Sequence, residues 1–428
     1  MRIRTACIIW ALAAGAMALP AAAQERRPGV PRVLVDRRLQ ERSVRVTGLD
    51  GKSIAYVDST GLPRTEPVAE FVALLMPEES EAGTTGIALG VGRASGAQPG
   101  PRFRPPAPVT LLELVDGERF AGALSLEGSG ERLGWTHPAI GTMSYDLEDV
   151  LRVRLLEAEA SERPMPPVPG GADVVTLANG DRLEGYVEAV AREVRLQAGT
   201  TVRRVAVELV REVSLANETK RGAERQYWLR DGSVVSPRDV RTTRAGELIL
   251  SVGRTEPTEN PAGEAGGELP PLQLDDLIGA TFDGAMVPIA RLAASQRSVS
   301  ERAWSGPVRV IEGETALLGL AAIEIPGPME VEWVLPAGAT RVAFEAELPR
   351  PCWTWGDLEV VVLSAGGGSN AEGTELARRR LHADQPRARV NVPLVRGAKR
   401  LRVRVEAGVS GAVQDRVVLH RGAVLVEP

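Results

Sequence analysis

The sequence predicts an all-β protein, and three observations lead to this fold class. Short runs of Val, Leu and Ile are separated every few residues by Gly, Pro, Asp or Asn, a pattern typical of strands and turns. Asp-Gly or Asn-Gly recurs four times between such runs in the first half of the chain. After residue 304, apolar and polar residues alternate with the period of two that a half-buried strand requires.

The first 23 residues predict a secretory signal peptide. Arg2 and Arg4 precede an apolar run from about Ala6 to Leu19, and small residues up to Ala23 follow Pro20. No later segment of the sequence is long and apolar enough to span a bilayer, so we predict no transmembrane segment. We therefore expect an exported protein, whether periplasmic, cell-surface or secreted.

The composition argues against several classes of partner. Without Arg2 and Arg4, 49 basic residues face 56 acidic ones, a net charge of −7, whereas nucleic-acid binding requires a basic surface. Cys352 is the only cysteine outside the signal peptide, so we expect no intramolecular disulfide and a small buried apolar side chain. The histidines share no ligand spacing, so we expect no metal site and no cofactor; they are His137, His382 and His420.

Four related units occupy the first 300 residues. Each contains an apolar run, an Asp-Gly or Asn-Gly pair and a second apolar run, and each closes with acidic residues between apolar ones. Asn and Asp before Gly suit the positive φ angles of a type I′ turn, so each pair predicts a β-hairpin. The turn residues are Asp50, Asp116, Asn179 and Asp231. This structural role explains the pairs better than any functional one.

The turn pattern resembles small SH3-like or Sm-like barrels, most clearly over Val174 to Leu215, where it reads L-x-N-G-D-x-L-x-G. Sm-like barrels often bind RNA, a role that an acidic, exported chain does not support. The resulting order is a signal peptide (1–23), β repeats at 24–76, 109–156, 173–222 and 223–300, Pro/Gly-rich linkers at 77–108 and 157–172, and a long loop at 253–270 inside the degenerate fourth repeat. We expect the repeats to be spacers or protein-binding modules.

Residues 301–428 predict an antiparallel β-sandwich. In three segments the apolar residues fall on alternate positions, which assigns one face of each strand to the core. The expected core residues are Met329, Val331, Trp333 and Leu335, then Val342, Phe344, Ala346 and Leu348, then Leu401, Val403 and Val405. Two sheets with one wet face each pack as a sandwich.

The order of segments in this sandwich is similar to the NPCBM family of carbohydrate-binding modules. The matching segments are Gly319 to Leu348, Trp355 to Leu363, Val390 to Gly408 and Asp415 to Pro428. The resemblance implies a jelly-roll-like sandwich that binds glycan. The chain departs from the family pattern in two places, because the first segment lacks the family's histidine and only Asp415 of the closing motif remains.

The candidate ligand site is Trp353, Trp355, Asp357 and Glu359. If one strand ran from Cys352 to Leu363, alternation would place these four side chains together on a wet face. An indole stacks on a pyranose ring while polar neighbours bond its hydroxyls, so this face would suit a sugar. Two alternatives remain: Gly356 marks a bend and the tryptophans pack over an open edge, or the carboxylates of Asp357, Glu359 and Asp415 hold a structural calcium ion.

No sequence motif of catalysis is present, so we expect a protein that is not an enzyme and has no catalytic residue. The first functional hypothesis is an exported binding protein that contacts glycan or cell-envelope polysaccharide through the sandwich. The alternative is an envelope scaffold, in which a sandwich without glycan binding contacts cell-envelope proteins. The missing histidine and closing tryptophan favour the alternative, and the family resemblance favours the first.

Overall fold

The computed structural model confirms the all-β fold. It describes residues 29–77, 110–126, 132–156, 171–220, 224–243, 245–252, 271–298, 306–311, 316–366, 373–409, 411 and 414–427. The predicted signal peptide and most of the predicted linkers lie outside these residues. Within them, every helical element is a three-residue 3-10 turn, and all remaining regular structure is strand. No helix among the described residues has the length and hydropathy to cross a membrane.

The four units share one order of elements, in which a hairpin is followed by a 3-10 turn and a closing strand. The first unit contains β1 (Val30–Asp36), β2 (Glu41–Leu49), β3 (Ser53–Val57), β4 (Pro63–Pro67), η1 (Val68–Glu70) and β5 (Phe71–Leu75). The second contains β6 (Leu111–Leu114), β7 (Arg119–Ala121), β8 (Ala123–Ser125), β9 (Arg132–His137), β10 (Gly141–Asp146), η2 (Leu147–Asp149) and β11 (Val150–Arg154).

The third unit contains β12 (Asp173–Leu177), β13 (Arg182–Val190), β14 (Glu193–Ala198), β15 (Thr201–Ala206), η3 (Val207–Leu209) and β16 (Val210–Ser214). The fourth contains β17 (Gln226–Leu229), β18 (Val234–Val235), β19 (Pro237–Thr242), β20 (Glu247–Val252), β21 (Leu272–Gln273), η4 (Leu274–Asp276) and β22 (Leu277–Thr281). In three of the units the glycine of the turn has positive φ, namely Gly117 (84°), Gly180 (91°) and Gly232 (92°). These turns therefore use the glycine as its conformational freedom predicts.

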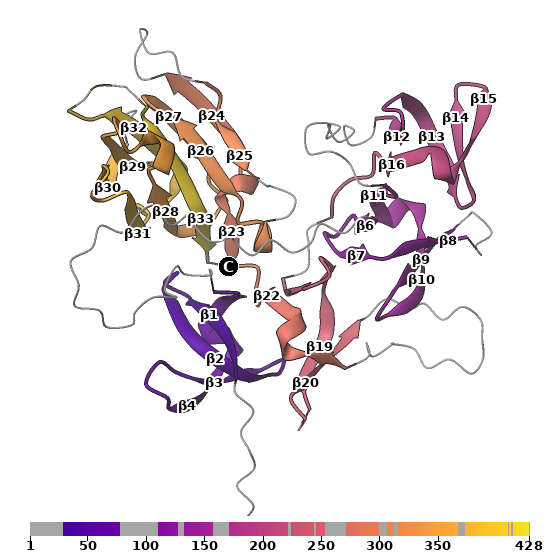
Figure 1. The fold of residues 1–428 in the computed structure, drawn as a ribbon, viewed down its shortest axis with the longest axis horizontal. Helices are drawn as coiled ribbons and strands as arrows, with labels where there is room; N and C mark the ends of the chain where they lie inside the picture. The colour runs from indigo at the N-terminus through magenta and orange to yellow at the C-terminus, as the bar shows by residue number, and fades with distance from the viewer. Residues whose placement is uncertain are drawn as a thin grey trace, which may run out of the picture.

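The four units are joined edge to edge in one 16-stranded sheet (Figure 1). The closing strand β16 of the third unit pairs with β11 of the second, and β22 of the fourth pairs with β5 of the first. Between these two pairs of units, β7 meets β18 at Arg119 and Val234. The order across the sheet is third, second, fourth and first unit, so neighbours in the sequence are not always neighbours in the sheet.

Buried polar contacts connect the units at each of these junctions. Between the first and fourth units, the guanidinium of Arg32 donates to the backbone oxygens of Leu274 (3.2 Å) and Leu277 (2.6 Å). Burial lowers the pKa of Arg32 to about 10. Between the second and third units, the carboxylate of Glu212, which is 3% exposed, lies 3.8 Å from Arg152 and 3.7 Å from Arg154. These contacts bring opposite charges or dipoles to groups that would be costly to bury alone.

The sandwich is formed by two antiparallel sheets, as predicted. One has the order β25-β26-β33-β28-β31 with β23 also paired to β33, and the other has the order β24-β27-β32-β29-β30. The elements are β23 (Met286–Pro288), η5 (Ile289–Arg291), β24 (Ala294–Ser298), β25 (Arg309–Ile311), η6 (Leu317–Gly319), β26 (Ala322–Pro326), β27 (Met329–Val334), β28 (Ala339–Glu347), η7 (Arg350–Cys352), β29 (Leu358–Gly366), β30 (Thr374–Leu381), β31 (Arg387–Pro393), β32 (Ala398–Ala407) and β33 (Arg416–Val426).

Two strands of the sandwich lie before residue 301. β23 and β24 fall in the range expected for the fourth repeat, yet they pair with β33 and β27 of the sandwich. Neither strand shows apolar alternation, because β23 has three residues and β24 reads ASQRS, so the sequence gives no signal for them. The alternation further along does mark the core, since Trp333 is 2% exposed and Leu401 is fully buried.

The sandwich also packs against the first and fourth units. A buried cluster combines Ala343, Ala423 and Leu425 of β28 and β33 with residues of the first and fourth units, including Val33, Val72, Leu75 and Ile278. At its edge, the amide of Asn391 donates to the backbone oxygens of Arg38 and Leu39, both at 3.0 Å. One face of the sandwich is therefore covered by the chain's own N-terminal unit.

Candidate functional site

Trp353 and Trp355 lie in a turn before β29, not in the strand itself. A single strand from Cys352 to Leu363 is not formed, because residues 350–352 form η7 and β29 begins only at Leu358; the alternative with a bend at Gly356 holds. The backbone N–H of Gly356 donates to the oxygen of Cys352 at 2.6 Å, and a Cβ on Gly356 would lie 2.6 Å from that oxygen. The four predicted site residues consequently do not share one strand face.

The two tryptophans have different environments. Trp353 is half-buried against the sandwich core, and its indole Nε1 donates to the backbone oxygen of Leu348 at 2.9 Å. The guanidinium of Arg350 lies 5.6 Å from the centre of the Trp353 ring, within cation-π distance. Trp355 is 60% exposed. Trp353 thus holds the turn in place, and Trp355 presents its indole to solvent.

Asp357 connects the tryptophan turn to the turn after β32. Its carboxylate accepts two hydrogen bonds from Arg380, both 2.8 Å, and one from the backbone N–H of Val409 at 3.1 Å. Its backbone oxygen accepts from Gly408 at 2.7 Å, and a Cβ on Gly408 would lie 2.2 Å from that oxygen. The hydrogen bonds from Arg380 lower the pKa of Asp357. Asp357 is 8% exposed, so it positions this site and does not face a ligand.

Val409 is the second apolar side chain exposed at this end of the sandwich, at 83%. Because Asp357 follows Trp355 by two residues and bonds to Val409, the turns that carry Trp355 and Val409 are tied together. We define the sandwich-end patch as Trp355 and Val409 with the supporting residues Trp353, Asp357 and Arg380. Its two exposed apolar side chains lie on turns that Asp357 joins, and an exposed indole is a group on which a sugar ring can stack.

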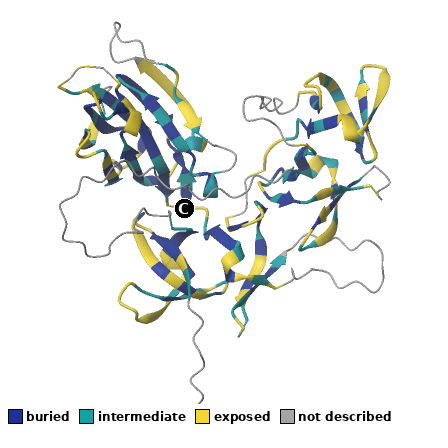
Figure 2. Cartoon of the chain, in the orientation of Figure 1, coloured by how far each residue is buried: buried dark blue, intermediate teal, exposed yellow. Residues whose placement is uncertain are grey.

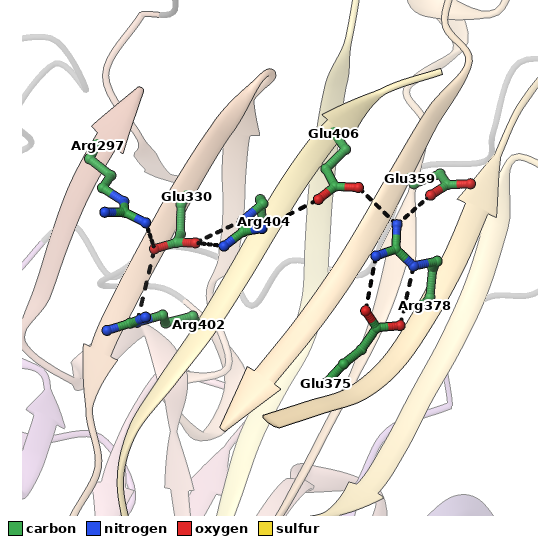
Figure 3. A network of polar contacts seen from close by, with 8 residues as sticks. All are labelled: Arg297, Glu330, Glu359, Glu375, Arg378, Arg402, Arg404 and Glu406. Carbon is green, nitrogen blue, oxygen red and sulfur yellow. Dashed lines mark hydrogen bonds and ion pairs between the residues drawn. The ribbon is translucent and has the colours of Figure 1, made fainter. Parts of the chain in front are cut away.

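Glu359 belongs to a different surface, the outer face of the sheet β24-β27-β32-β29-β30. Figure 3 shows the charged network on that face. Arg378 contacts Glu359 at 2.6 Å, Glu406 at 2.8 Å and Glu375 at 2.9 Å, and these contacts raise its pKa. The only aromatic residue in these five strands, Trp333, points into the core. Among the described residues of these strands, no aromatic ring faces outward for a sugar to stack on.

Glu330 is the buried centre of the same network, and its removal should destabilise the fold. It is 3% exposed and pairs with Arg297 at 3.0 Å, Arg404 at 2.8 Å and Arg402 at 3.9 Å. Glu330→Gln would leave these guanidinium groups without their shared charge, so we expect a loss of about 3 kcal/mol in the free energy of unfolding. Urea denaturation measures it.

Glu375→Gln is the matched control, because the Glu375 side chain is 45% exposed on the same face. We expect it to cost less than about 1 kcal/mol. Equal losses for the two variants would contradict a special role for the buried Glu330.

Asp415 is a buried carboxylate at the same end of the sandwich. It is 5% exposed, and neither carboxylate oxygen makes a hydrogen bond of normal geometry among the described residues. Burial raises the pKa of Asp415 to about 7, which its interaction with the backbone of Asp357 only partly offsets. Among the described residues no group of three His, Cys, Asp or Glu side chains is placed to hold a metal ion. Glu359, one of the three carboxylates considered for calcium, is paired with Arg378 instead.

A cluster of His137, Asp231 and Ser233 joins the second and fourth units and was not predicted. His137 Nε2 lies 2.9 Å from Asp231 Oδ2 and 3.0 Å from Ser233 Oγ. His137 Nδ1 accepts from the backbone N–H groups of Ala139 (3.0 Å) and Ile140 (3.1 Å), which assigns the imidazole proton to Nε2. Residues 94 positions apart in the sequence meet here, so no local motif could have indicated them.

This cluster contains the residue types of a hydrolase triad but not the geometry. In a triad the serine and the carboxylate contact opposite nitrogens of the imidazole, so that one nitrogen can accept the serine proton. Here both contact Nε2, and the lone pair of Nδ1 accepts hydrogen bonds from two backbone amides. His137 is also 1% exposed and Ser233 is fully buried. The cluster therefore serves as a junction between units.

No protein-family profile matches this chain, and neither does any curated protein sequence. Several solved structures are similar to this chain. One contains the CBM51-2 and INT domains of ZmpB from Clostridium perfringens; it is 14% identical over 42% of this chain and 37% of that one, with a TM-score of 0.26. This chain thus spans little more than a third of that structure.

Two further solved structures have a comparable likeness. A CBM51 module of a family 95 glycoside hydrolase from Clostridium perfringens, in complex with methyl-galactose, is 12% identical over 32% of this chain and 99% of that one, with a TM-score of 0.25. The tandem CBM51 modules of a family 98 glycoside hydrolase from Streptococcus pneumoniae are 10% identical over 59% and 88%, with a TM-score of 0.27. Likenesses of this size carry no conclusion about function.

Proposed function

We propose that this chain is an exported, non-catalytic binding protein that contacts glycan through the sandwich-end patch. The observation that carries the proposal is the 60% exposure of Trp355 on a turn fixed by Trp353 and Asp357. A large apolar ring held in solvent is costly unless it meets a ligand, and an indole stacks on the C–H face of a pyranose. The resemblance of the segment order to the NPCBM family supports the same ligand class, and the predicted signal peptide supports export.

The proposal of a non-catalytic role rests on the geometry of the described residues. The one serine, histidine and aspartate cluster is buried and has the wrong arrangement for proton transfer. Glu359 and Asp357 of the candidate site are engaged by Arg378 and Arg380 and are not positioned as an acid and base. Binding therefore explains the patch better than a reaction does.

Replacement of Trp355 tests this proposal. We expect the full chain without the predicted signal peptide to bind one member of a panel of soluble polysaccharides, and Trp355→Ala to weaken that binding by at least about tenfold because the stacking ring is lost. Isothermal titration calorimetry measures both. Val334→Ala is the matched control, because Val334 is 59% exposed elsewhere on the sandwich. Binding that Trp355→Ala leaves unchanged would overturn the proposed site.

The second candidate function is an envelope scaffold that contacts proteins. It is favoured by the continuous sheet, which joins the four units edge to edge, and by the cover that the first unit places over one sandwich face. In this function the four units would carry the contacts. Failure of every polysaccharide to bind a folded chain would move the conclusion to this candidate.

A further inference from the structure

The two ends of the 16-stranded sheet differ in a way that bears on binding. One end is β4 and the other is β15. Two hydrogen bonds show which backbone groups of β4 point toward β3. Asp58 N–H donates to Leu62 O before the strand, and Val68 N–H donates to Lys52 O after it. The alternation of an antiparallel ladder then leaves the outward positions to Pro63, Thr65 and Pro67. Two of these three are prolines without an N–H, so this end of the sheet is blocked.

The equivalent positions of β15 carry no such block. The bond from Val207 N–H to Arg192 O and the pair of Ala198 with Thr201 fix the inward residues in the same way. The outward N–H and C=O groups therefore belong to Val202, Arg204 and Ala206, which occupy the places of Pro63, Thr65 and Pro67. Five of the six residues of β15 are exposed, and Figure 2 shows this hairpin as largely exposed.

Among the described residues, the arginines beside this edge have no acidic partner. Arg195 and Arg204 lie directly opposite one another on β14 and β15, and like charges in that position destabilise a sheet. Neither they nor Arg203 forms an ion pair with a described residue, although Glu193 lies in the same strand as Arg195. On the charged face of the sandwich, by contrast, the arginines meet carboxylates (Figure 3). An acidic side chain beside Arg204 would remove this repulsion.

Two exposed apolar side chains, Tyr186 and Val202, lie in one row next to this edge. The sheet register places Tyr186, Gln197 and Val202 side by side on three adjacent strands. Tyr186 is 67% exposed and Val202 is 48% exposed. A strand added beyond β15 would extend this row, so that one of its apolar side chains could pack against Val202.

We propose that β15 is a docking edge for an extended, acidic polypeptide segment of another protein, which adds to the sheet as a further strand. Backbone bonds to Val202, Arg204 and Ala206 supply affinity, and acidic side chains opposite Arg203 and Arg204 supply selectivity. A second copy of this chain is disfavoured in the two registers centred on these arginines. Antiparallel self-pairing centred on Arg203 or on Arg204 places that arginine against its own copy, a repulsive contact.

A peptide titration tests this inference in the full chain without the predicted signal peptide. The probe is a fluorescein-labelled peptide Thr-Val-Glu-Glu-Val-Thr, followed by fluorescence anisotropy at low ionic strength. We expect saturable binding that the double variant Arg203→Glu with Arg204→Glu weakens by at least about tenfold, because opposite charges become like charges. The same variant should gain binding to the probe Thr-Val-Lys-Lys-Val-Thr.

A second variant tests the backbone contribution without changing charge. Val202→Pro with Ala206→Pro transfers the block of β4 to β15. It removes two outward N–H groups together with the Val202 side chain and keeps the inward N–H groups that pair with β14, so we expect loss of the acidic probe by at least about tenfold. Thr65→Pro on β4 is the matched control and should bind as the parent does. The inference is overturned if the parent shows no saturable binding, or if the proline variant, shown to be folded by circular dichroism, binds the probe as tightly as the parent does. It is also overturned if soluble polygalacturonate displaces the probe from the parent and binds the parent and the proline variant with equal affinity.

Discussion

A fragment that begins at Trp304 is expected not to fold into a stable sandwich, although the sequence alone suggests that boundary. It lacks β23, which pairs with β33, and β24, which pairs with Met329 to Trp333 of β27. It also lacks Ile289, which is fully buried in the sandwich core. Loss of a buried aliphatic side chain alone typically costs about 2–5 kcal/mol, and a domain is stable by only about 5–15 kcal/mol.

A longer fragment, residues 285–428, is the comparison for this prediction. It restores both strands and Ile289, so we expect cooperative thermal unfolding by circular dichroism. It still exposes the face of Ala343, Ala423 and Leu425 that the first unit covers in the full chain, so its Tm should be lower than that of the full chain. Cooperative unfolding of the fragment from 304 at the same Tm as the longer one would contradict the assignment of β23 and β24 to the sandwich.

The second large effect is a gain of stability on replacing Asp415 with Asn. Burial raises the pKa of Asp415 from 3.8 to about 7, so the folded chain retains a proton that the unfolded chain has lost. The contribution of Asp415 to the free energy of unfolding is therefore highest near pH 4. It falls as the pH rises towards 7 and is not regained at higher pH. The difference corresponds to at most about 4 kcal/mol. Asp415→Asn cannot ionise, so we expect it to unfold at a higher Tm than the parent at pH 8 and at a similar Tm at pH 4.

Asp357→Asn provides a control of opposite sign. The hydrogen bonds from Arg380 lower the pKa of Asp357. The ionised carboxylate therefore stabilises the fold at neutral pH, and this contribution is lost as the pH falls below the ordinary aspartate pKa of 3.8. This variant should therefore be less stable than the parent at pH 8. Scanning calorimetry across pH 4 to 8 compares the three proteins, and a Tm of Asp415→Asn that falls with the parent's would refute the buried, ionising Asp415.

The fold of each segment could be predicted from its sequence, but the assembly of the segments could not. Alternation places Val331 and Val403 in the core because a strand has a period of two, and both are fully buried. The pairing of β7 with β18 and of β22 with β5 depends on which exposed strand edges fit one another. The periodicity within a strand does not indicate which other edge it pairs with. The contact of His137 with Asp231 likewise joins residues that no local pattern connects.

The candidate site shows the same limit on a smaller scale. The exposure of Trp355 was expected from a strand beginning at Cys352, one of two alternatives, whereas Trp355 lies in a turn and β29 begins at Leu358. The turn at Gly356 depends on hydrogen bonds to Cys352 and on the close approach of their backbones. Asp357 and Glu359 follow the turn, and each meets an arginine from β30, a neighbour that sequence spacing does not identify.

The most direct test of the glycan proposal is the ¹⁹F NMR spectrum of the full chain labelled with 5-fluorotryptophan, titrated with the polysaccharide panel. Trp355→Phe assigns the resonance of the exposed residue. We expect one polysaccharide to shift the Trp355 resonance in a saturable manner and to leave the resonances of the buried Trp135 and Trp333 unchanged. An unchanged Trp355 resonance with every polysaccharide, in a chain whose spectrum shows a folded protein, would contradict the claim that the sandwich-end patch binds glycan.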